Sequence, residues 1–234
     1  MRESEKLQLI ATQFGYSNGI MQSSIAHCFG ILLEHLAPGN ILELGPAEGV
    51  MTAMLHGTQR HISVVEGSTK FCEMIKARFS DVDVFNTLFE QFAPVGKFNN
   101  IVLGHVLEHV EDPEALLMQI KNWLAPGGIV FAAVPNAKSL HRQAAVMMGL
   151  LETENTLNSA DIDHGHRRVF NPDEFLAIFK NTGYSIRKTG GYWLKPLSNK
   201  QIEDSWTPEM IAAFMQLGER FPEIAGEIYL VASK

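Results

Sequence analysis

The sequence is short of cysteine, of basic residues and of long apolar runs, and each shortage excludes a class of protein. Only Cys28 and Cys72 occur, without a paired spacing, so we expect two reduced thiols and neither a disulfide framework nor a zinc knot. The chain has 19 Lys and Arg residues against 26 Asp and Glu residues, and a net charge of -7 does not favour binding to the negatively charged backbone of a nucleic acid. No apolar run approaches the roughly 20 residues that span a bilayer, and the first residues lack the apolar core of a signal peptide. We therefore expect a cytoplasmic protein that binds neither a membrane nor nucleic acid.

What the sequence does contain, from residue 40 onward, is an alternation of short apolar runs with longer amphipathic stretches. The first three runs are almost continuously apolar, which is typical of strands covered by helices on both faces. Between them, Phe71, Ile75 and Phe79 recur at helical spacing, and Asp112 followed by Pro113 predicts the start of another helix. The pattern predicts a doubly wound α/β domain with a parallel sheet. Its predicted strands lie within residues 40–45, 61–67, 82–86, 98–104 and 127–135.

The remaining segments depart from this alternation. Residues 136–170 contain no clear strand and are rich in His and Arg, so we interpret them as an insertion that covers substrate. A helix capped by Asn171 and stopped at Gly183 precedes an aromatic strand. The last strand follows without a clear crossover and is expected to pair antiparallel. We thus divide the chain into a helical extension or lid over residues 1–38 and a main domain over residues 39–234.

The stretch ELGPAEG, residues 43–49, predicts a ligand-binding turn after the first strand. Gly45 and Gly49 permit a sharp turn and a close approach of a ligand to the backbone. Glu66 ends the second strand, where an acid can accept both hydroxyls of a ribose. The stretch is not G-x-G-x-x-G, and no lysine follows to bind a triphosphate, which excludes a P-loop. Glu43 would attract an ammonium or a sulfonium, so we expect a cationic, zwitterionic nucleoside.

These features together resemble class I S-adenosylmethionine-dependent methyltransferases over roughly residues 38–190. The resemblance rests on ELGPAEG, on Glu66, on the segment from residue 98 to residue 136 and on HGHRRVF at residues 164–170. Its most specific piece, LEHVEDP, resembles small-molecule methyltransferases related to ubiquinone-pathway and sugar-modifying enzymes. The resemblance implies a Rossmann-like sheet of seven strands in the order 3-2-1-4-5-7-6, with strand 7 antiparallel. It also implies S-adenosyl-L-methionine as the cofactor and S-adenosyl-L-homocysteine as the product.

The resemblance places residues around such a cofactor. Many relatives carry an Asp after the third strand, whereas this chain has Leu88, Phe89 and Glu90 there, so we expect adenine to stack on Phe89. Tyr16 and Met21 would touch the cofactor from the lid. The predicted cofactor-binding residues are Glu43, Gly45, Gly49, Glu66, Gly67, Leu88, Phe89, Glu90, His105, Tyr16 and Met21.

Methyl transfer from a sulfonium is an in-line displacement, which requires alignment, and a base only for an acidic nucleophile. An imidazole suits that task, and we predict that His105 and His166 face the substrate as catalytic residues. His109 has the alternative of packing beside Glu108 as a structural residue, and His164 also has a structural role as its alternative. We predict no metal site, because HVLEH is not H-E-x-x-H and the histidine pairs lie far apart in sequence. The predicted substrate-binding residues are His109, Asn136, His141, Arg142, His164 and Arg167, of which Arg167 has the alternative of pairing with Asp161, Asp163 or Glu174.

Three functions fit the pattern. The first is a methyltransferase, monomeric or homodimeric, that acts on oxygen or nitrogen of a small molecule such as a specialised metabolite, a cofactor precursor or a sugar. The second is a non-catalytic cofactor-binding protein of the same fold. The third is a nicotinamide-dependent dehydrogenase, which shares the ribose acid but requires the glycine triplet that this chain lacks.

Overall fold

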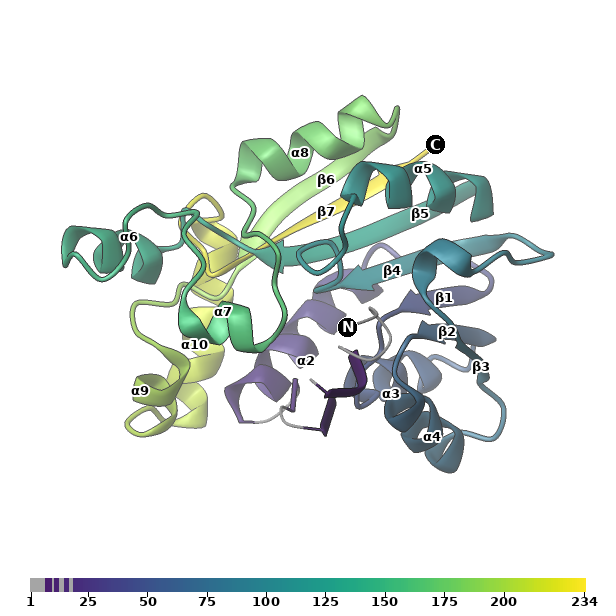
Figure 1. Ribbon diagram of the computed structural model, residues 1–234, viewed down its shortest axis with the longest axis horizontal. Helices are drawn as coiled ribbons and strands as arrows, with labels where there is room; N and C mark the ends of the chain where they lie inside the picture. The colour runs from purple at the N-terminus through teal and green to yellow at the C-terminus, as the bar shows by residue number, and fades with distance from the viewer. Residues whose placement is uncertain (1–6, 10, 13–14, 17–18) are drawn as a thin grey trace.

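The computed structural model describes residues 7–9, 11–12, 15–16 and 19–234. The predicted lid over residues 1–38 therefore lies partly outside the described residues, and its described helix is α2 (Ile20–Leu33). Seven strands form one sheet in the order β3-β2-β1-β4-β5-β7-β6, as predicted (Figure 1). The strands are β1 (Ile41–Leu44), β2 (Ile62–Glu66), β3 (Asp83–Asn86), β4 (Phe98–Gly104), β5 (Leu124–Pro135), β6 (Ser185–Tyr192) and β7 (Glu227–Ser233).

The pairing of β7 confirms the predicted direction of the last strand. It runs antiparallel to both β5 and β6, whereas β1 pairs in parallel with β2 and β4. Because β7 runs backward, its first residue, Glu227, lies beside Pro135 at the end of β5. The start of β7 therefore reaches the edge where the parallel strands end.

Helices cover the two faces of the sheet (Figure 1). On one face, Leu117 of α5 (Pro113–Trp123) and Phe179 of α8 (Pro172–Asn181) pack on the side chains of β1, β4, β5 and β7 that point to them. On the other face, Leu32 of α2 and Met215 of α10 (Pro208–Arg220) share a second core with Phe131 of β5. No helix of the described residues is long and apolar enough to cross a membrane. The helices after α2 are α3 (Val50–His56), α4 (Thr69–Arg78), α5 (Pro113–Trp123), α6 (Leu140–Met147), α7 (Ser159–Asp163), α8 (Pro172–Asn181), α9 (Asn199–Glu203) and α10 (Pro208–Arg220), with a 3-10 turn, η1 (Phe89–Gln91).

Two helix starts that the sequence predicts have the expected caps. Asp112 accepts a hydrogen bond from the backbone N–H of Ala115 at 3.0 Å, with Pro113 in the first turn of α5. Asn171 and Glu174 form a reciprocal capping box at the start of α8. The first of these caps fixes the end of the loop between β4 and α5, on which part of the candidate site lies.

The structure corrects the prediction in two places. The third apolar run is not covered on both faces, because β3 is the edge strand of the sheet, and Phe85 there is 41% exposed. The prediction from the sequence also did not include the helices α9 and α10. In α10, Gly218 lies so close to β6 that a Cβ atom would stand 2.2 Å from the backbone nitrogen of Trp193. The absence of a side chain at Gly218 thus allows α10 to pack closely against the end of β6.

Candidate active site

A cavity of about 1130 Å³ lies at the edge of the sheet where the parallel strands end. This is the edge at which open α/β sheets bind their ligands. The predicted site residues gather around it from the turn after β1, the end of β2, the loop after β4 and the segment 136–170. The predicted residues that line it are Tyr16, Met21, Glu43, Gly45, Glu66, Gly67, Leu88, Phe89, Glu90, His105, His109, Asn136, His141, Arg142, His164, His166 and Arg167.

Gly49 is the one predicted site residue that the cavity lining does not include. It caps the start of α3 with a φ of 77°, and a side chain there would meet Ile75 of α4 at 3.3 Å. Gly45, with a φ of 66°, does line the cavity, and a Cβ atom would stand 3.2 Å from the Val106 side chain. Both glycines thus adopt a left-handed backbone conformation, but only Gly45 exposes its backbone at the cavity wall.

The carboxylate of Glu66 ties the end of β2 to the turn after β1. Its Oε1 accepts a hydrogen bond from the backbone N–H of Ser68 at 2.7 Å, and its Oε2 accepts one from Ala47 at 3.3 Å. Burial raises the pKa of Glu66 to about 7, although these backbone hydrogen bonds act in the opposite direction. A ligand that donates hydrogen bonds would favour the ionised carboxylate.

Glu43 is a second buried carboxylate on the cavity wall. It accepts a hydrogen bond from the Thr52 hydroxyl at 2.7 Å, and burial raises its pKa to about 7. Glu43 and Glu66 both line the cavity and both have raised pKa values. A bound cation would favour their ionised forms, so this part of the cavity suits a positively charged ligand.

The turn after β3 forms another wall of the cavity. Leu88 precedes η1, and the Phe89 ring lies next to Gly45, 3.5 Å from the position of a Cβ atom there. The side-chain amide of Gln119 donates to the backbone oxygens of Glu90 at 3.3 Å and Phe92 at 3.2 Å, which fixes the turn against α5. An apolar ring is thus held beside the glycine turn.

Tyr16 joins the N-terminal segment to two sides of the cavity. Its backbone N–H donates to Glu48 Oε1 at 2.8 Å, and its hydroxyl donates to the backbone oxygen of His164 at 3.3 Å. Met21 lines the cavity from α2, where its sulfur accepts a hydrogen bond from the Asn199 side chain at 3.5 Å. The N-terminal segment therefore connects the glycine turn to the segment 136–170.

His105 stands between two carboxylates at the end of β4. Its Nδ1 lies 3.2 Å from Glu108 Oε1, and its Nε2 lies 3.7 Å from Glu227 Oε2. Burial would lower the pKa of His105, but the charges of Glu227 and Glu108 outweigh it and raise the pKa to about 9. The residue also has a φ of 59°, a left-handed conformation that costs free energy in a residue other than glycine. This strain is typical of residues held in place at a functional site.

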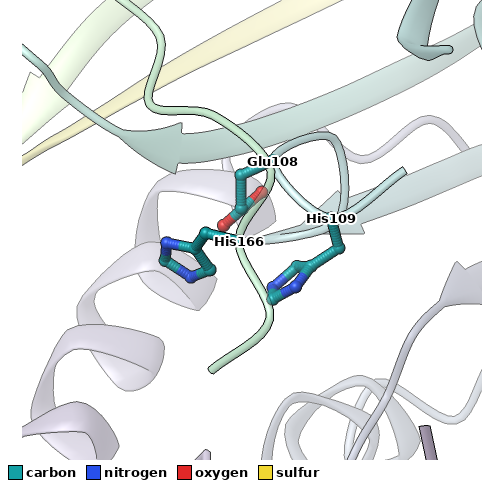
Figure 2. A group of neighbouring side chains, drawn as sticks. All are labelled: Glu108, His109 and His166. Carbon is teal, nitrogen blue, oxygen red and sulfur yellow. The ribbon is translucent and has the colours of Figure 1, made fainter. Parts of the chain in front are cut away.

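The loop after β4 and the segment 136–170 meet at Glu108, His109 and His166. The backbone N–H of Arg167 donates to the backbone oxygen of Glu108 at 2.8 Å, and its side-chain Nε donates to the backbone oxygen of His109 at 2.8 Å. Figure 2 shows the Glu108 side chain and the two imidazoles together, from segments more than fifty residues apart. The separation in sequence, on which the prediction of no metal rested, therefore does not separate these side chains in space.

Arg142 and Asn136 use their polar atoms to hold the segment 136–170. Arg142 donates to Asp161 Oδ2 at 3.0 Å and to the backbone oxygens of Glu154, at 2.8 Å, and Thr156. The Asn136 side-chain amide donates to two backbone oxygens in the loop before β7 and accepts a hydrogen bond from the Lys138 N–H at 2.9 Å. In the described structure both residues thus shape the cavity wall, and their substrate contacts stay a prediction.

Sequence reasoning missed several charged residues of this cavity. Lys195 lines it beside the Trp193 ring, with its Nζ 4.9 Å from the ring centroid, and burial lowers its pKa to about 8. Burial, followed by the charge of Lys195, lowers the pKa of His141 to about 3. Glu227 was not predicted either, although an antiparallel last strand must start at the edge where the parallel strands end. That signal was available from the sequence.

Comparisons with known proteins agree with this geometry. A family model described as a methyltransferase domain matches residues 19–189. The chain is 28% identical over 147 residues to the ubiquinone biosynthesis O-methyltransferase of Rhizobium etli (strain CIAT 652), which covers 62% of this chain and 56% of that protein. It is 25% identical over 166 residues to the protein of the same name from Dinoroseobacter shibae, covering 68% of this chain and 65% of that protein. The chain therefore spans little more than half the length of such relatives.

Solved structures show the same fold at low identity. The N-methyltransferase NodS from Bradyrhizobium japonicum WM9, in complex with S-adenosyl-L-homocysteine, has a TM-score of 0.64 and 14% identity, covering 98% of this chain and 96% of that one. A methyltransferase from Thermotoga maritima, described as a possible histamine N-methyltransferase, has a TM-score of 0.66 and 15% identity, covering 99% and 94%. The family model spans well over half of the sequence, and the chain belongs to the family of methyltransferase domains.

Proposed function

We propose that this protein transfers the methyl group of S-adenosyl-L-methionine to an oxygen or nitrogen atom of a small molecule. The observation that carries the proposal is one cavity that joins the Gly45 turn and the buried acids Glu43 and Glu66 to a group of histidines at the end of β4. The first part has the hydrogen-bond acceptors and the negative charge that suit a cationic nucleoside. The second part has groups that can contact an acceptor.

The residues of the first part fit the proposed cofactor. Glu66 retains further lone pairs beside its two backbone contacts and would accept the ribose hydroxyls, while Glu43 would face the positively charged amino-acid part. Gly45 leaves the backbone open at the cavity wall, and Phe89 would stack on the adenine. The raised pKa values of the two acids support this assignment, because both carboxylates gain from a ligand that supplies donors or positive charge.

The chemistry then consists mainly of alignment. When bound, the cofactor would supply an electrophilic methyl group: the acceptor atom would form a bond to the methyl carbon, the carbon–sulfur bond would break with its electron pair on sulfur, and the proton of a hydroxyl or amine acceptor would pass to a base or to solvent. We propose that His105 and His166 face the acceptor and orient it, as the sequence predicts. Tyr16 would close the cavity from the N-terminal side through its bonds to Glu48 and the His164 oxygen, which excludes water from the reacting atoms.

The names of the relatives guide the choice of acceptor. Curated relatives are called ubiquinone biosynthesis O-methyltransferases, whereas some structural neighbours are N-methyltransferases. The cavity has both apolar walls and ionisable side chains at the histidine end. Phenols and catechols with an apolar substituent therefore come first in an acceptor panel, followed by aromatic amines and sugars.

The test has a binding arm and a turnover arm. Calorimetric titration of the purified chain with S-adenosyl-L-homocysteine is expected to give stoichiometric binding, and a parallel titration with NADH is expected to give none. Labelled methyl groups from S-adenosyl-L-methionine should then appear in at least one member of the acceptor panel. Binding without transfer to any acceptor would favour a non-catalytic cofactor-binding protein, and binding of NADH alone would favour a dehydrogenase.

A further inference from the structure

We propose that Glu108, His109 and His166 bind a divalent transition-metal ion, with Zn²⁺ as the reference ion, at the acceptor end of the cavity. Each side chain offers one ligand atom, and these atoms all lie within 4.8 Å of one another. Figure 2 shows the carboxylate and the two imidazoles gathered at one place. A set of two histidines and one carboxylate is a recurrent ligand set of catalytic metal sites that keep a position open.

The carboxylate of Glu108 gives the strongest support for a cation at this site. The side chain is fully buried, and its Oε1 faces His105 Nδ1 at 3.2 Å. Its Oε2 is also buried but has no hydrogen-bond partner among the residues that the structure describes. An unsatisfied buried carboxylate oxygen costs free energy, so a buried carboxylate requires a cation or donors on both oxygens. A metal ion at Oε2 would satisfy it.

The His166 imidazole has a carboxylate behind it, as metal-binding histidines often do. Its Nδ1 lies 3.3 Å from Asp161 Oδ1. The ring centroids of His109 and His166 lie 4.8 Å apart. A carboxylate behind the His166 ring would fix its orientation and leave its other nitrogen for the metal.

The backbone around the three residues is tied together. The His109 N–H donates to the Val106 oxygen at 3.0 Å, and the His166 N–H donates to the Asp161 oxygen at 2.9 Å. The backbone N–H of Arg167 links the two segments through its hydrogen bond to the backbone oxygen of Glu108. Tetrahedral bond lengths near 2.0–2.2 Å would bring the ligand atoms to about 3.4 Å from one another, so the side chains, now within 4.8 Å, would close in on the ion.

The donor set selects the class of metal. Imidazole nitrogens suit Zn²⁺, Fe²⁺, Co²⁺ and Ni²⁺, whereas Mg²⁺ and Ca²⁺ prefer oxygen ligands. Three protein ligands leave a coordination position that an acceptor hydroxyl can occupy, and coordination would lower the pKa of that hydroxyl. This use of the metal rests on the proposed methyl transfer, but metal binding itself does not.

The closing experiment measures Zn²⁺ binding to the full chain. Chelator-treated protein is titrated with Zn²⁺ in competition with a chromogenic chelator, and the bound metal is counted by elemental analysis. We expect one ion per chain, retained in the presence of a large excess of Mg²⁺. His166→Ala and Glu108→Gln should each weaken binding at least about 10-fold. His164→Ala is the matched control, because its ring bonds to the Ala160 oxygen at 2.7 Å within its own helix and is not part of the three-residue set.

Several outcomes decide the proposal. The proposal is wrong if the chelator-treated wild-type protein binds no Zn²⁺ at micromolar concentration. It is also wrong if His166→Ala and Glu108→Gln both bind Zn²⁺ as tightly as His164→Ala. Circular dichroism shows whether each variant is folded, and His166→Ala serves if the buried Glu108→Gln change prevents folding. The chelator-treated protein is also titrated with S-adenosyl-L-homocysteine. Cofactor binding without Zn²⁺ binding would overturn the metal site alone, and Zn²⁺ binding without cofactor binding would overturn the proposed function alone.

Discussion

The replacement of Glu66 by glutamine tests the cofactor end of the cavity most directly. The side chain keeps its shape and one acceptor oxygen, so it can still receive the Ser68 or the Ala47 N–H, but it loses the charge. A hydrogen bond to a charged group contributes about 1.5 to 3 kcal/mol, and loss of that contribution at the ribose corresponds to roughly 10- to 100-fold weaker binding. Glu66→Ala should weaken cofactor binding at least as much as Glu66→Gln, because it also leaves the backbone N–H groups of Ala47 and Ser68 without this acceptor.

The assay is calorimetric titration with S-adenosyl-L-homocysteine at about pH 8, where a carboxyl with a pKa of about 7 is mostly ionised. Asp83→Asn is the charge-matched control, since Asp83 is exposed on the edge strand β3 and does not line the cavity. The wild type should also bind more weakly as the pH falls below about 7, because Glu66 becomes protonated, and Glu66→Gln should lack this dependence. A dissociation constant of Glu66→Gln within about 3-fold of the control, which is under 1 kcal/mol, would refute the placement of the ribose at Glu66.

Three further predictions concern stability. Because the folded pKa of Glu43 is raised from 4.5 to about 7, the ligand-free protein should lose stability as the pH rises through this interval, and Glu43→Gln should recover on the order of 3 kcal/mol at about pH 8 in urea unfolding. Gly218→Ala should lower the free energy of unfolding by about 1 to 3 kcal/mol, since a Cβ atom would stand 2.2 Å from the Trp193 nitrogen. Arg142→Met should cost about 3 to 5 kcal/mol, because Asp161 would lose its buried partner at 3.0 Å.

Each of these predictions has a result that would contradict it. A Glu43→Gln variant with the same pH dependence of stability as the wild type would mean that Glu43 is already ionised in the fold. An unchanged melting temperature for Gly218→Ala would mean that α10 can move away from β6 without loss. An Arg142→Met variant as stable as the wild type would mean that the bonds of Arg142 contribute no net stability.

Local patterns in the sequence predicted most of the sheet. Residues 41–44, 62–66 and 98–104 are apolar enough to be strands by composition alone, and Asp112 and Asn171 mark their helices through side-chain caps. The order of the strands came from the family resemblance, because nothing local specifies which strand lies next to which. The edge position of β3, which accompanies its exposure, was likewise not specified by the local pattern.

The candidate site was predictable where it depends on one turn and not where it depends on distant segments. The glycine turn and Glu66 are close in sequence and were found together. The meeting of His166 with Glu108 depends on how the segment 136–170 folds back, through hydrogen bonds such as that from Arg167 to the Glu108 oxygen. The missed helix α10 is different, because Thr207 followed by Pro208 was a local start signal.

The position of β7 has a consequence for how the chain folds. Residues 227–233 form an inner strand, buried along its whole length, yet they are made after all the other strands. Until they emerge during synthesis, β5 and β6 lack their common neighbour and present unpaired edges, which are sites of aggregation. Completion of the sheet thus depends on long-range pairing after all the other strands have been made, and folding should be slow compared with that of helical proteins of similar size.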